Sequence, residues 1–308
     1  MARRVVAAGY GGPENLRVED IPLPSPGAGQ VRVAVRAAGV NAYDAKVYAA
    51  DGDPAKLPIR LGYEAAGVVD AVGPGVDDWS PGDEVIVFRT SGAYATDLVV
   101  ATSALTPKPA SLDWPDAAAL MLTGAAAWHA VTAARVDAGD VVLIHGGSGG
   151  VGLYAVQLAL LRGARVLATG GESSHELLHS LGAEPVRYGD GLLDRVRSLA
   201  PSVDVALDLV GTDEAMDVSL ALVEDRSRIV SIANFDRAPR ERVQLLGNGP
   251  GADPGTEIRD AARADLARLA GDGSLRVFVG STYPLAEAAD AHRQILTGHT
   301  TGKLVLLP

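Results

Sequence analysis

Val141-Val-Leu-Ile-His-Gly-Gly-Ser-Gly-Gly-Val-Gly152 is the stretch that decides the fold, because it joins an apolar run to a glycine-rich turn. A short apolar run that ends at turn residues is typical of a buried β-strand. The apolar segment 150–161, which opens at the end of this turn, has the length of a helix. A strand, a glycine turn and a helix in this order predict a unit that binds the phosphates of a dinucleotide.

The glycines of this turn match the spacing G-x-G-x-x-G over Gly147-Ser-Gly-Gly-Val-Gly152. Glycine permits a tight turn, lets the backbone approach a pyrophosphate and lets the helix pack against the strand. The first N–H groups of the helix and the positive end of its dipole then attract the anion. We therefore expect the pyrophosphate of a dinucleotide to be held by Gly147, Ser148, Gly149, Gly150 and Val151.

Strand and helix patterns alternate along the chain after this turn. An alternation at this spacing implies right-handed βαβ units and a parallel sheet, so we predict a doubly wound α/β fold for this region. The strands are expected at 141–144, 165–169, 203–208 and 228–232, and the helices at 150–161 and 174–181.

Residues 1–115 show a different pattern, in which short strands with alternating apolar and polar residues are separated by turns rich in Gly and Pro. This pattern predicts a compact barrel-like all-β unit. Strands are expected in this region at 31–36, 67–72 and 84–88, and near the end of the chain at 276–279 and 303–307. The remaining predictions are helices within 116–135 and at 261–269, and a polar loop over 236–257.

The composition is that of an ordinary globular chain of 308 residues, with 47% hydrophobic and 21% charged residues. The chain has no cysteine, which excludes disulfides, thiolate nucleophiles, cysteine-ligated zinc and iron–sulfur clusters. The formal net charge of -11 disfavours nucleic acid, whose phosphates need clustered Lys and Arg. No apolar run approaches the roughly 20 residues that span a bilayer, and we expect a soluble cytoplasmic protein.

The end of the second strand of the parallel sheet selects between two forms of the cofactor. In an NAD-binding unit, an acidic residue at this point holds the hydroxyls of the adenosine ribose. Here the position is Gly170, which leaves space for a 2′-phosphate and favours NADPH. The alternative is that Glu172, slightly further on, supplies the acidic group. The expected contacts of this part of NADPH are Thr169, Gly170, Ser173, Ser174, Arg187 and Tyr188.

Landmarks that resemble a known family cover nearly the whole chain. They are Ala38-Gly-Val-Asn-Ala-Tyr-Asp44, Leu61-Gly-Tyr-Glu-Ala-Ala-Gly67, Val72-Gly-Pro-Gly-Val76, Pro81-Gly-Asp-Glu-Val85, the glycine turn described above and Gly302-Lys-Leu-Val-Leu306. Together and in this order they resemble the medium-chain dehydrogenase/reductase superfamily, and within it the zinc-free quinone oxidoreductase branch that includes zeta-crystallin.

The resemblance implies a fold and a set of contacts. A GroES-like β-barrel catalytic domain is expected at 1–117, completed by 277–308. A Rossmann domain, with a doubly wound parallel sheet that binds NADPH, is expected at 118–276. The family also implies a homodimer, and cofactor contacts from the loops that hold Val210, Ile232 and Ala233. Thr123 is expected to substitute for a cofactor-contacting Thr of the family, because this chain has an Ala at that position. Lys303 either reaches the cofactor or forms a surface salt bridge.

The same resemblance bears on zinc. The zinc-dependent relatives carry a Cys where this chain has Asn41, a His where it has Tyr63, and a third ligand near Leu122. Glu64 alone cannot build a three-ligand catalytic zinc site. The resemblance therefore implies no metal, and without a Lewis acid the oxidation of a simple alcohol lacks its usual activation.

The candidate catalytic side chains are Asn41, Tyr43 and Lys46. By the resemblance, Asn41 lies beside the nicotinamide and positions the acceptor. The segment that holds Tyr43 is similar to a stretch of some polyketide synthase enoylreductase domains, where this Tyr is a proposed proton donor. A phenol can act as a general acid, although the alternative is a Tyr packed under the cleft. Lys46 either orients a carbonyl or is an exposed surface lysine.

The sequence leaves three functions open. The first is a zinc-independent reductase that transfers hydride from NADPH to a quinone or a related electron-poor carbonyl. The second is an enoyl reductase for an α,β-unsaturated thioester, aldehyde or ketone. The third is a non-catalytic NADPH-binding protein with a structural or sensing role. The expected partner is a small molecule, with neither nucleic acid nor membrane.

Overall fold

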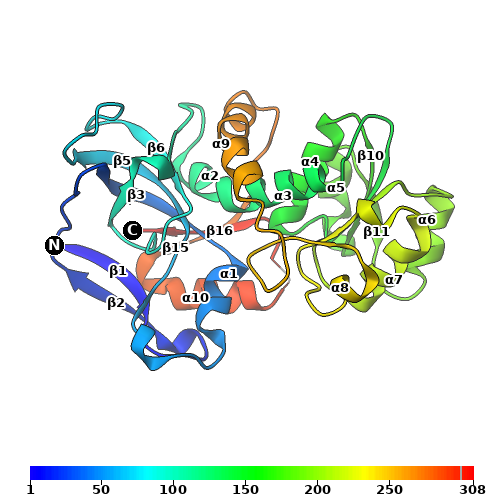
Figure 1. The fold of residues 1–308 in the computed structure, drawn as a ribbon, viewed down its shortest axis with the longest axis horizontal. Helices are drawn as coiled ribbons and strands as arrows, with labels where there is room; N and C mark the ends of the chain where they lie inside the picture. Colours follow the sequence, from blue (N-terminus) through cyan, green and yellow to red (C-terminus); the bar gives the residue numbers. More distant parts are fainter. Residues whose placement is uncertain (299) are drawn as a thin grey trace. The chain divides into compact units, whose positions relative to one another are not determined.

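The computed structural model describes residues 1–298 and 300–308, which form two compact units (Figure 1). Unit 1 contains Met1–Leu122 and Arg263–Pro308, and unit 2 contains Thr123–Ala262. Within the described residues, no helix is both long and apolar enough to cross a membrane.

Unit 2 is a Rossmann fold with one parallel sheet of six strands in the order β11-β10-β9-β12-β13-β14. The first strand in the chain, β9, lies in the middle of the sheet, and the later strands are added on both sides of it, as in doubly wound sheets. The strands are β9 (Val141–His145), β10 (Arg165–Gly170), β11 (Glu184–Arg187), β12 (Val205–Asp208), β13 (Ile229–Ser231) and β14 (Gln244–Leu245). The helices that follow them are α4 (Gly150–Leu161), α5 (His175–Ser180), α6 (Leu192–Leu199), α7 (Asp213–Leu222) and α8 (Ala238–Glu241).

The middle of this sheet is apolar on both faces. Every residue of β12 is buried, and so are Val142, Leu143 and Ile144 of β9. Helix α4 packs against β9 and β10 and is buried from Gly152 through Ala159. A helix that is apolar all round is typical of such a covered position. The predicted parallel α/β architecture is confirmed.

The segment 236–257 was predicted as a loop, and this prediction was wrong in part. The segment contains α8 and β14, and β14 extends the sheet through the pairs Val230 with Gln244 and Ser231 with Leu245. A strand as short as β14 shows no alternation in a sequence, so its pattern could not be separated from that of a loop.

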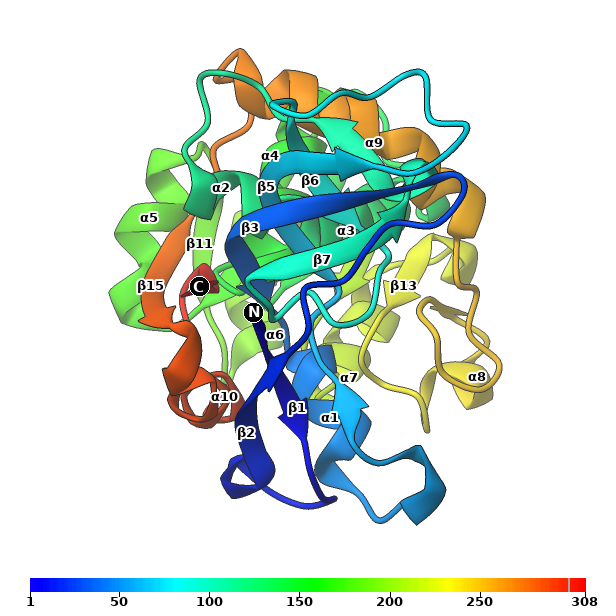
Figure 2. The ribbon, with the colours of Figure 1, turned by 90° about the vertical axis from the view of Figure 1, so that its left-hand side faces the viewer.

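Unit 1 is a β-rich, GroES-like domain with two sheets. The larger has the order β15-β16-β3-β5-β6-β8, with β7 paired to β3, and the smaller has the order β2-β1-β4. Figure 2 shows β3, β5, β6 and β7 of the larger sheet. The strands are β1 (Ala2–Ala7), β2 (Leu16–Ile21), β3 (Gln30–Val40), β4 (Ile59–Arg60), β5 (Glu64–Val72), β6 (Glu84–Phe88), β7 (Asp97–Ala101), β8 (Leu105–Pro107), β15 (Val279–Pro284) and β16 (Lys303–Leu307).

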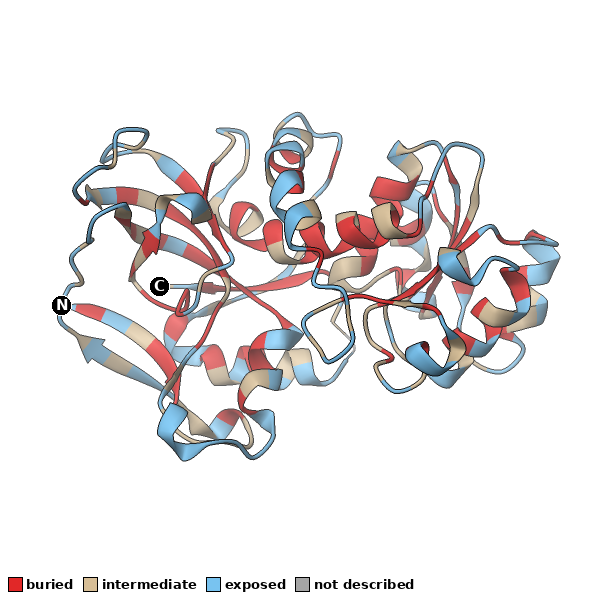
Figure 3. Ribbon diagram, viewed as in Figure 1, coloured by how far each residue is buried: buried red, intermediate tan, exposed pale blue. Residues whose placement is uncertain are grey.

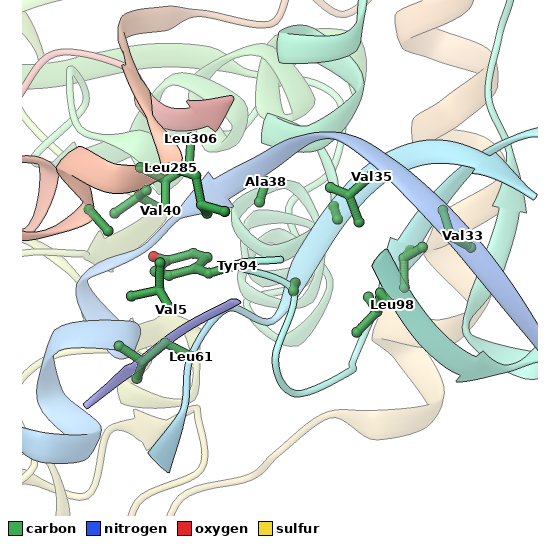
Figure 4. Packing of buried hydrophobic residues seen from close by; sticks show 14 of the residues in the cluster. Val5, Val33, Val35, Ala38, Val40, Leu61, Tyr94, Leu98, Leu285 and Leu306 are labelled. Atoms are coloured by element: carbon green, nitrogen blue, oxygen red, sulfur yellow. The ribbon is translucent and has the colours of Figure 1, made fainter. Parts of the chain in front are cut away.

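The last strand of the chain is part of this sheet. β16 runs antiparallel to β3, so that Leu304 pairs with Val40 and Leu306 pairs with Ala38. Strands β6 and β16 are buried over most of their length, whereas β2 and β15 have no buried residue (Figure 3). Their inward side chains form one apolar cluster, shown in Figure 4, that includes Val5, Val33, Val35, Leu98, Leu285 and Leu306.

Helices in unit 1 are α1 (Ala42–Ala49), α2 (Trp114–Ala119) and α10 (Ala288–Leu296). Two further helices, α3 (Met121–Ala133) and α9 (Thr256–Gly271), contain the points at which the chain passes from one unit to the other. The strand predicted at 276–279 was wrong, since β15 begins only at Val279 and continues to Pro284. β15 is an edge strand with no buried residue, so its side chains show no strong apolar signal.

Candidate active site

The glycine-rich turn of unit 2 has no room for a side chain at Gly147 or Gly152. A Cβ atom at Gly152 would lie 2.1 Å from the carbonyl oxygen of Gly146, and one at Gly147 would lie 2.7 Å from Cβ of Ala168. Gly149 is the N-cap of α4, and no side chain caps this helix. The first N–H groups of α4 are therefore available to an anion, and the turn fits a pyrophosphate. The predicted contacts from Gly147, Ser148, Gly149, Gly150 and Val151 all lie on this turn.

Gly170, the last residue of β10, is closely surrounded. A Cβ atom at Gly170 would lie 2.4 Å from Oγ of Ser174, so any larger residue here requires the Ser174 hydroxyl to move. Ser174 is buried, and its hydroxyl donates to the carbonyl oxygen of Gly171 at 2.7 Å. Oγ1 of Thr169 accepts from the N–H of Gly146 at 2.9 Å. The hydroxyl groups of Thr169 and Ser174 thus bind backbone groups around the end of β10.

Arg187 lies beside Gly170 across the pairing of β10 with β11. Its guanidinium forms an ion pair with Glu172 at 2.9 Å, and both side chains are exposed. Ser173 and Tyr188 are also exposed. Glu172, the alternative ribose ligand, is therefore the surface partner of Arg187 in this structure.

One buried carboxylate fixes the loops after β12 and β13. Oδ1 of Asp208 accepts from the N–H groups of Val210 at 3.1 Å and Gly211 at 2.8 Å, and Oδ2 accepts from the Ser231 hydroxyl at 2.8 Å. The Ser231 oxygen in turn accepts from the N–H of Ala233 at 3.3 Å. Both loops therefore have a defined shape, and they carry the predicted contacts Val210, Ile232 and Ala233.

His145, at the end of β9, is buried beside the glycine turn, and its Nε2 lies 3.2 Å from Oγ of Ser219. Burial lowers the pKa of His145 to about 4. The imidazole is therefore neutral at physiological pH and serves the packing of unit 2.

Acidification from about pH 6.5 to about pH 4 is expected to destabilise the fold through His145, by up to about 3 kcal/mol. In this window the unfolded imidazole binds a proton and the folded one does not, so stability rises with pH. Urea unfolding between pH 4 and 8 measures the slope. His145→Gln should lower the slope without abolishing it, because His292 titrates in the same window, and the exposed His179→Gln should leave it unchanged. Equal slopes for all three proteins would contradict this expectation.

Three buried side chains form a closed polar cluster in unit 1. Nζ of Lys303 donates to Oε1 of Glu64 at 2.8 Å, to the carbonyl oxygen of Val40 at 3.1 Å and to Oδ1 of Asn41. Nδ2 of Asn41 donates to Oε1 of Glu64 at 3.0 Å. Oε2 of Glu64 accepts from the N–H of Leu122 at 2.8 Å. The Lys303 ammonium thus neutralises a fully buried carboxylate.

The cluster arises where three neighbouring strands of the larger sheet meet. Asn41 directly follows β3, Glu64 begins β5 and Lys303 begins β16. Both ends of the Asn41 amide are bonded inside the cluster, and Lys303 has three oxygen partners there. The predicted contact between Lys303 and the cofactor stays a prediction, and its observed partners are these internal oxygens.

A second buried network borders the first. Nδ1 of His292 lies 2.7 Å from the Tyr48 hydroxyl, and its Nε2 lies 3.2 Å from the hydroxyl of Tyr94, which Figure 4 shows in the core. The Tyr94 hydroxyl donates to Oδ2 of Asp44 at 2.8 Å, and the N–H of Asn41 donates to the same oxygen at 2.7 Å. Burial raises the pKa of Asp44 to about 7 and lowers the pKa of His292 to about 4. Through the bond from the N–H of Asn41, Asp44 forms part of the capping box at the start of α1.

Tyr43 and Lys46 lie on the exposed side of α1. The Tyr43 ring meets the Tyr63 ring edge-on, with 4.9 Å between the centroids. Burial, together with the neighbouring Tyr43, raises the pKa of Tyr63 to about 12. Of the three predicted catalytic residues, Asn41 is thus inside the unit, whereas Tyr43, at 41% exposed, and Lys46 are accessible.

Comparison with known proteins finds the same architecture. The family model for the alcohol dehydrogenase GroES-like domain matches residues 27–110, and the model for zinc-binding dehydrogenases matches residues 181–306. A quinone oxidoreductase of Pseudomonas aeruginosa is 34% identical, over 100% of both chains. The chain belongs to the medium-chain dehydrogenase/reductase superfamily, in its quinone oxidoreductase branch.

Solved structures of related oxidoreductases agree with this membership. The Escherichia coli quinone oxidoreductase in complex with NADPH has a TM-score of 0.88 at 27% identity, covering 99% of this chain and 100% of that one. The CurK enoyl reductase has a TM-score of 0.86 at 26% identity and covers 99% of both chains. The protein described here is thus an oxidoreductase that uses a nicotinamide cofactor.

The name of one matching family model mentions zinc, but the residues of this protein do not fit a zinc site. Protein zinc sites use thiolate, imidazole or carboxylate ligands in a tetrahedral shell. By the family resemblance, Asn41 and Tyr63 stand where zinc-dependent relatives have ligands, and Glu64 is already paired with the Lys303 ammonium at 2.8 Å. A dication at this place would meet a resident positive charge, and like charges repel strongly in a buried site.

Thr123, a predicted cofactor contact, is buried in α3.

Other residues near the candidate site could not be predicted from the sequence. The second buried network contains Tyr48, Tyr94 and His292, none of which was predicted, because each is a lone polar residue far from the others in sequence. The buried ion pair of Glu64 with Lys303 was not predicted either.

Proposed function

We propose that the protein is an NADPH-dependent reductase that transfers hydride, without metal, to a quinone or a related electron-poor carbonyl. The observation that carries this proposal is the Asn41–Glu64–Lys303 cluster, where an ammonium rather than a Lewis acid faces the carboxylate. An acceptor whose carbonyl no metal polarises takes up hydride more readily if it is already electron-poor. Quinones and enones meet this requirement.

The nicotinamide supplies the hydride when the cofactor is bound. The part of the protein is to hold the cofactor and to orient the acceptor. The uncapped start of α4 and the turn from Gly146 to Gly149 suit the pyrophosphate, and the loops tied to Asp208 border it. The hydrogen bonds of the cluster around Lys303 keep Asn41 in one orientation. The phenol of Tyr43 is exposed and can donate a proton to a substrate.

The choice of NADPH over NADH is proposed to rest on Gly170 and Arg187. Arg187→Gln is expected to weaken NADPH binding about tenfold and to change NADH binding little, because a charged hydrogen bond to the 2′-phosphate is lost. Glu172→Gln should strengthen NADPH binding, since it frees Arg187 from its partner. Calorimetric titration of both cofactors measures the effect. Tighter NADH than NADPH binding by the unmodified protein would contradict the proposal.

A second candidate function is enoyl reduction of an α,β-unsaturated thioester, aldehyde or ketone. The accessible phenol of Tyr43, set edge-on against Tyr63, favours it, because reduction of a carbon–carbon double bond needs a proton at the α-carbon. The similarity to the CurK enoyl reductase supports the same candidate.

An acceptor panel tests the proposed function. The purified protein is mixed with NADPH and with quinones, 2-enoyl thioesters or 2-alkenals, and kcat/KM is measured for each. The proposal expects turnover of quinones, and the second candidate expects faster turnover of the enoyl substrates. Tight NADPH binding without turnover of any acceptor would overturn both, in favour of a non-catalytic NADPH-binding role.

A further inference from the structure

A hollow of about 580 Å³ lies in unit 1 beside the candidate phenols. Its size is within the range of about 300–1,000 Å³ that is usual for small-molecule sites. Tyr63, whose ring meets that of Tyr43, forms part of its wall. The charged side chains that line it are Lys46, Asp51, Asp53, Lys56 and Arg60.

The three cations of the hollow, Lys46, Lys56 and Arg60, are exposed, and none forms an ion pair with any residue that the structure describes. Asp53 is engaged elsewhere, since its Oδ1 accepts from the N–H of Ala55 at 2.9 Å. Together with the carboxylates of Asp51 and Asp53, the three cations give the hollow a net charge of +1, in a chain whose net charge is -11. A positively charged hollow on an otherwise acidic protein favours an anionic ligand.

The backbone around these cations is held in place. Lys56 ends a short 3₁₀ helix (Pro54–Lys56) that Asp53 caps, and the Tyr10 hydroxyl donates to the carbonyl oxygen of Asp53 at 2.9 Å. Arg60 lies on β4 and pairs with Val6 of β1. Two of the three cations therefore project from fixed positions, which lowers the entropic cost of binding an anion.

We propose that this hollow is a subsite for an oxyanion carried on the tail of the acceptor. The proposal rests on the proposed function, because the acceptor must place its electron-poor end near Tyr43 and Tyr63. Lys and Arg bind phosphate and sulfonate through charged hydrogen bonds, whereas a neutral tail forms no such bonds with them. Two sources of the oxyanion share this chemistry: the phosphate of a pantetheine-type thioester arm, and an acidic substituent of a quinone.

Matched substrate pairs test the subsite. The first pair is crotonyl-phosphopantetheine and crotonyl-pantetheine, which differ by one phosphate and lack the adenine that would compete with NADPH. The second pair is a sulfonated naphthoquinone and its parent. The measured quantity is the ratio of kcat/KM within each pair, so that general damage to the enzyme cancels. The direct binding of phosphopantetheine and of pantetheine, measured by calorimetry, gives a readout that needs no turnover.

The proposal expects the unmodified protein to prefer the anionic member of at least one pair by about tenfold. The double variant Lys56→Gln, Arg60→Gln should reduce the preference to near one, and added salt should weaken it. Arg36→Gln, an exposed cation on β3 outside the hollow, should keep the preference. The pair that shows the effect identifies the source of the oxyanion.

Equal rates within both pairs, or a preference that survives in the double variant, would overturn the subsite while leaving the proposed function intact. If no acceptor is reduced, the proposed function fails, and the calorimetric comparison decides on the subsite alone. In that case tighter binding of phosphopantetheine, lost in the double variant, supports the subsite, and equal binding of both compounds overturns it.

Discussion

Replacement of Lys303 by methionine is expected to lower the free energy of unfolding by about 3–5 kcal/mol. The ammonium and the Glu64 carboxylate are both almost completely buried and lie 2.8 Å apart. Lys303→Met would leave the carboxylate with only the amide of Asn41 and the N–H of Leu122 as partners. An uncompensated charge in such a place costs far more than the loss of an exposed ion pair.

The control for this prediction removes both charges. Lys303→Met combined with Glu64→Gln should recover a large part of the lost stability, because no buried charge then lacks a partner. Urea unfolding of the two single variants and the double variant gives the coupling energy directly. Additive losses in the double variant would show that the two side chains are not energetically coupled.

Replacement of Tyr43 by phenylalanine is expected to lower kcat for an enoyl substrate about a hundredfold, as the loss of a general acid does. The phenol is accessible, and the neighbouring Tyr63 has a pKa of about 12 and stays protonated. The variant keeps the ring and its edge-on contact with Tyr63, so packing changes little. Quinone reduction should fall less, because the oxygens of the product exchange protons with water.

The position of deuterium distinguishes this role from a structural one. With the unmodified protein in D₂O, deuterium should enter one face of the α-carbon, and Tyr43→Phe should lose this selectivity. Tyr63→Phe is the matched control, with the same hydroxyl removed from the partner ring. An unchanged rate and unchanged stereochemistry in Tyr43→Phe would remove Tyr43 as the proton donor.

The fold was predictable where apolar runs end at glycine or at turn residues. The helix 150–161 and the strands 84–88 and 303–307 have the predicted bounds. Helix α10 was missed, because its buried face consists of alanines and His292 and resembles a surface pattern. The chain passes from one unit to the other inside α3 and α9, where the sequence does not have the composition of a linker. The domain boundaries at 117 and 276 therefore remain a prediction.

The candidate site was predictable only in part, for a physical reason. The phosphate turn is local, so its residues are adjacent in sequence and its spacing shows its purpose. The Lys303–Glu64 pair depends on β16 lying beside β3, and no local pattern contains that information. The one signal was a lysine at the start of an apolar run, Lys303-Leu-Val-Leu-Leu307, where burial requires an acidic partner.

In the proposed reaction, hydride passes from NADPH to an electron-poor acceptor without metal. The most direct test is the rate of NADPH oxidation by a quinone after the protein has been stripped with a chelator, with its zinc content measured in the same sample. The account predicts full activity at negligible zinc, and no gain when zinc is added. Activity that disappears on stripping and returns with zinc would contradict it.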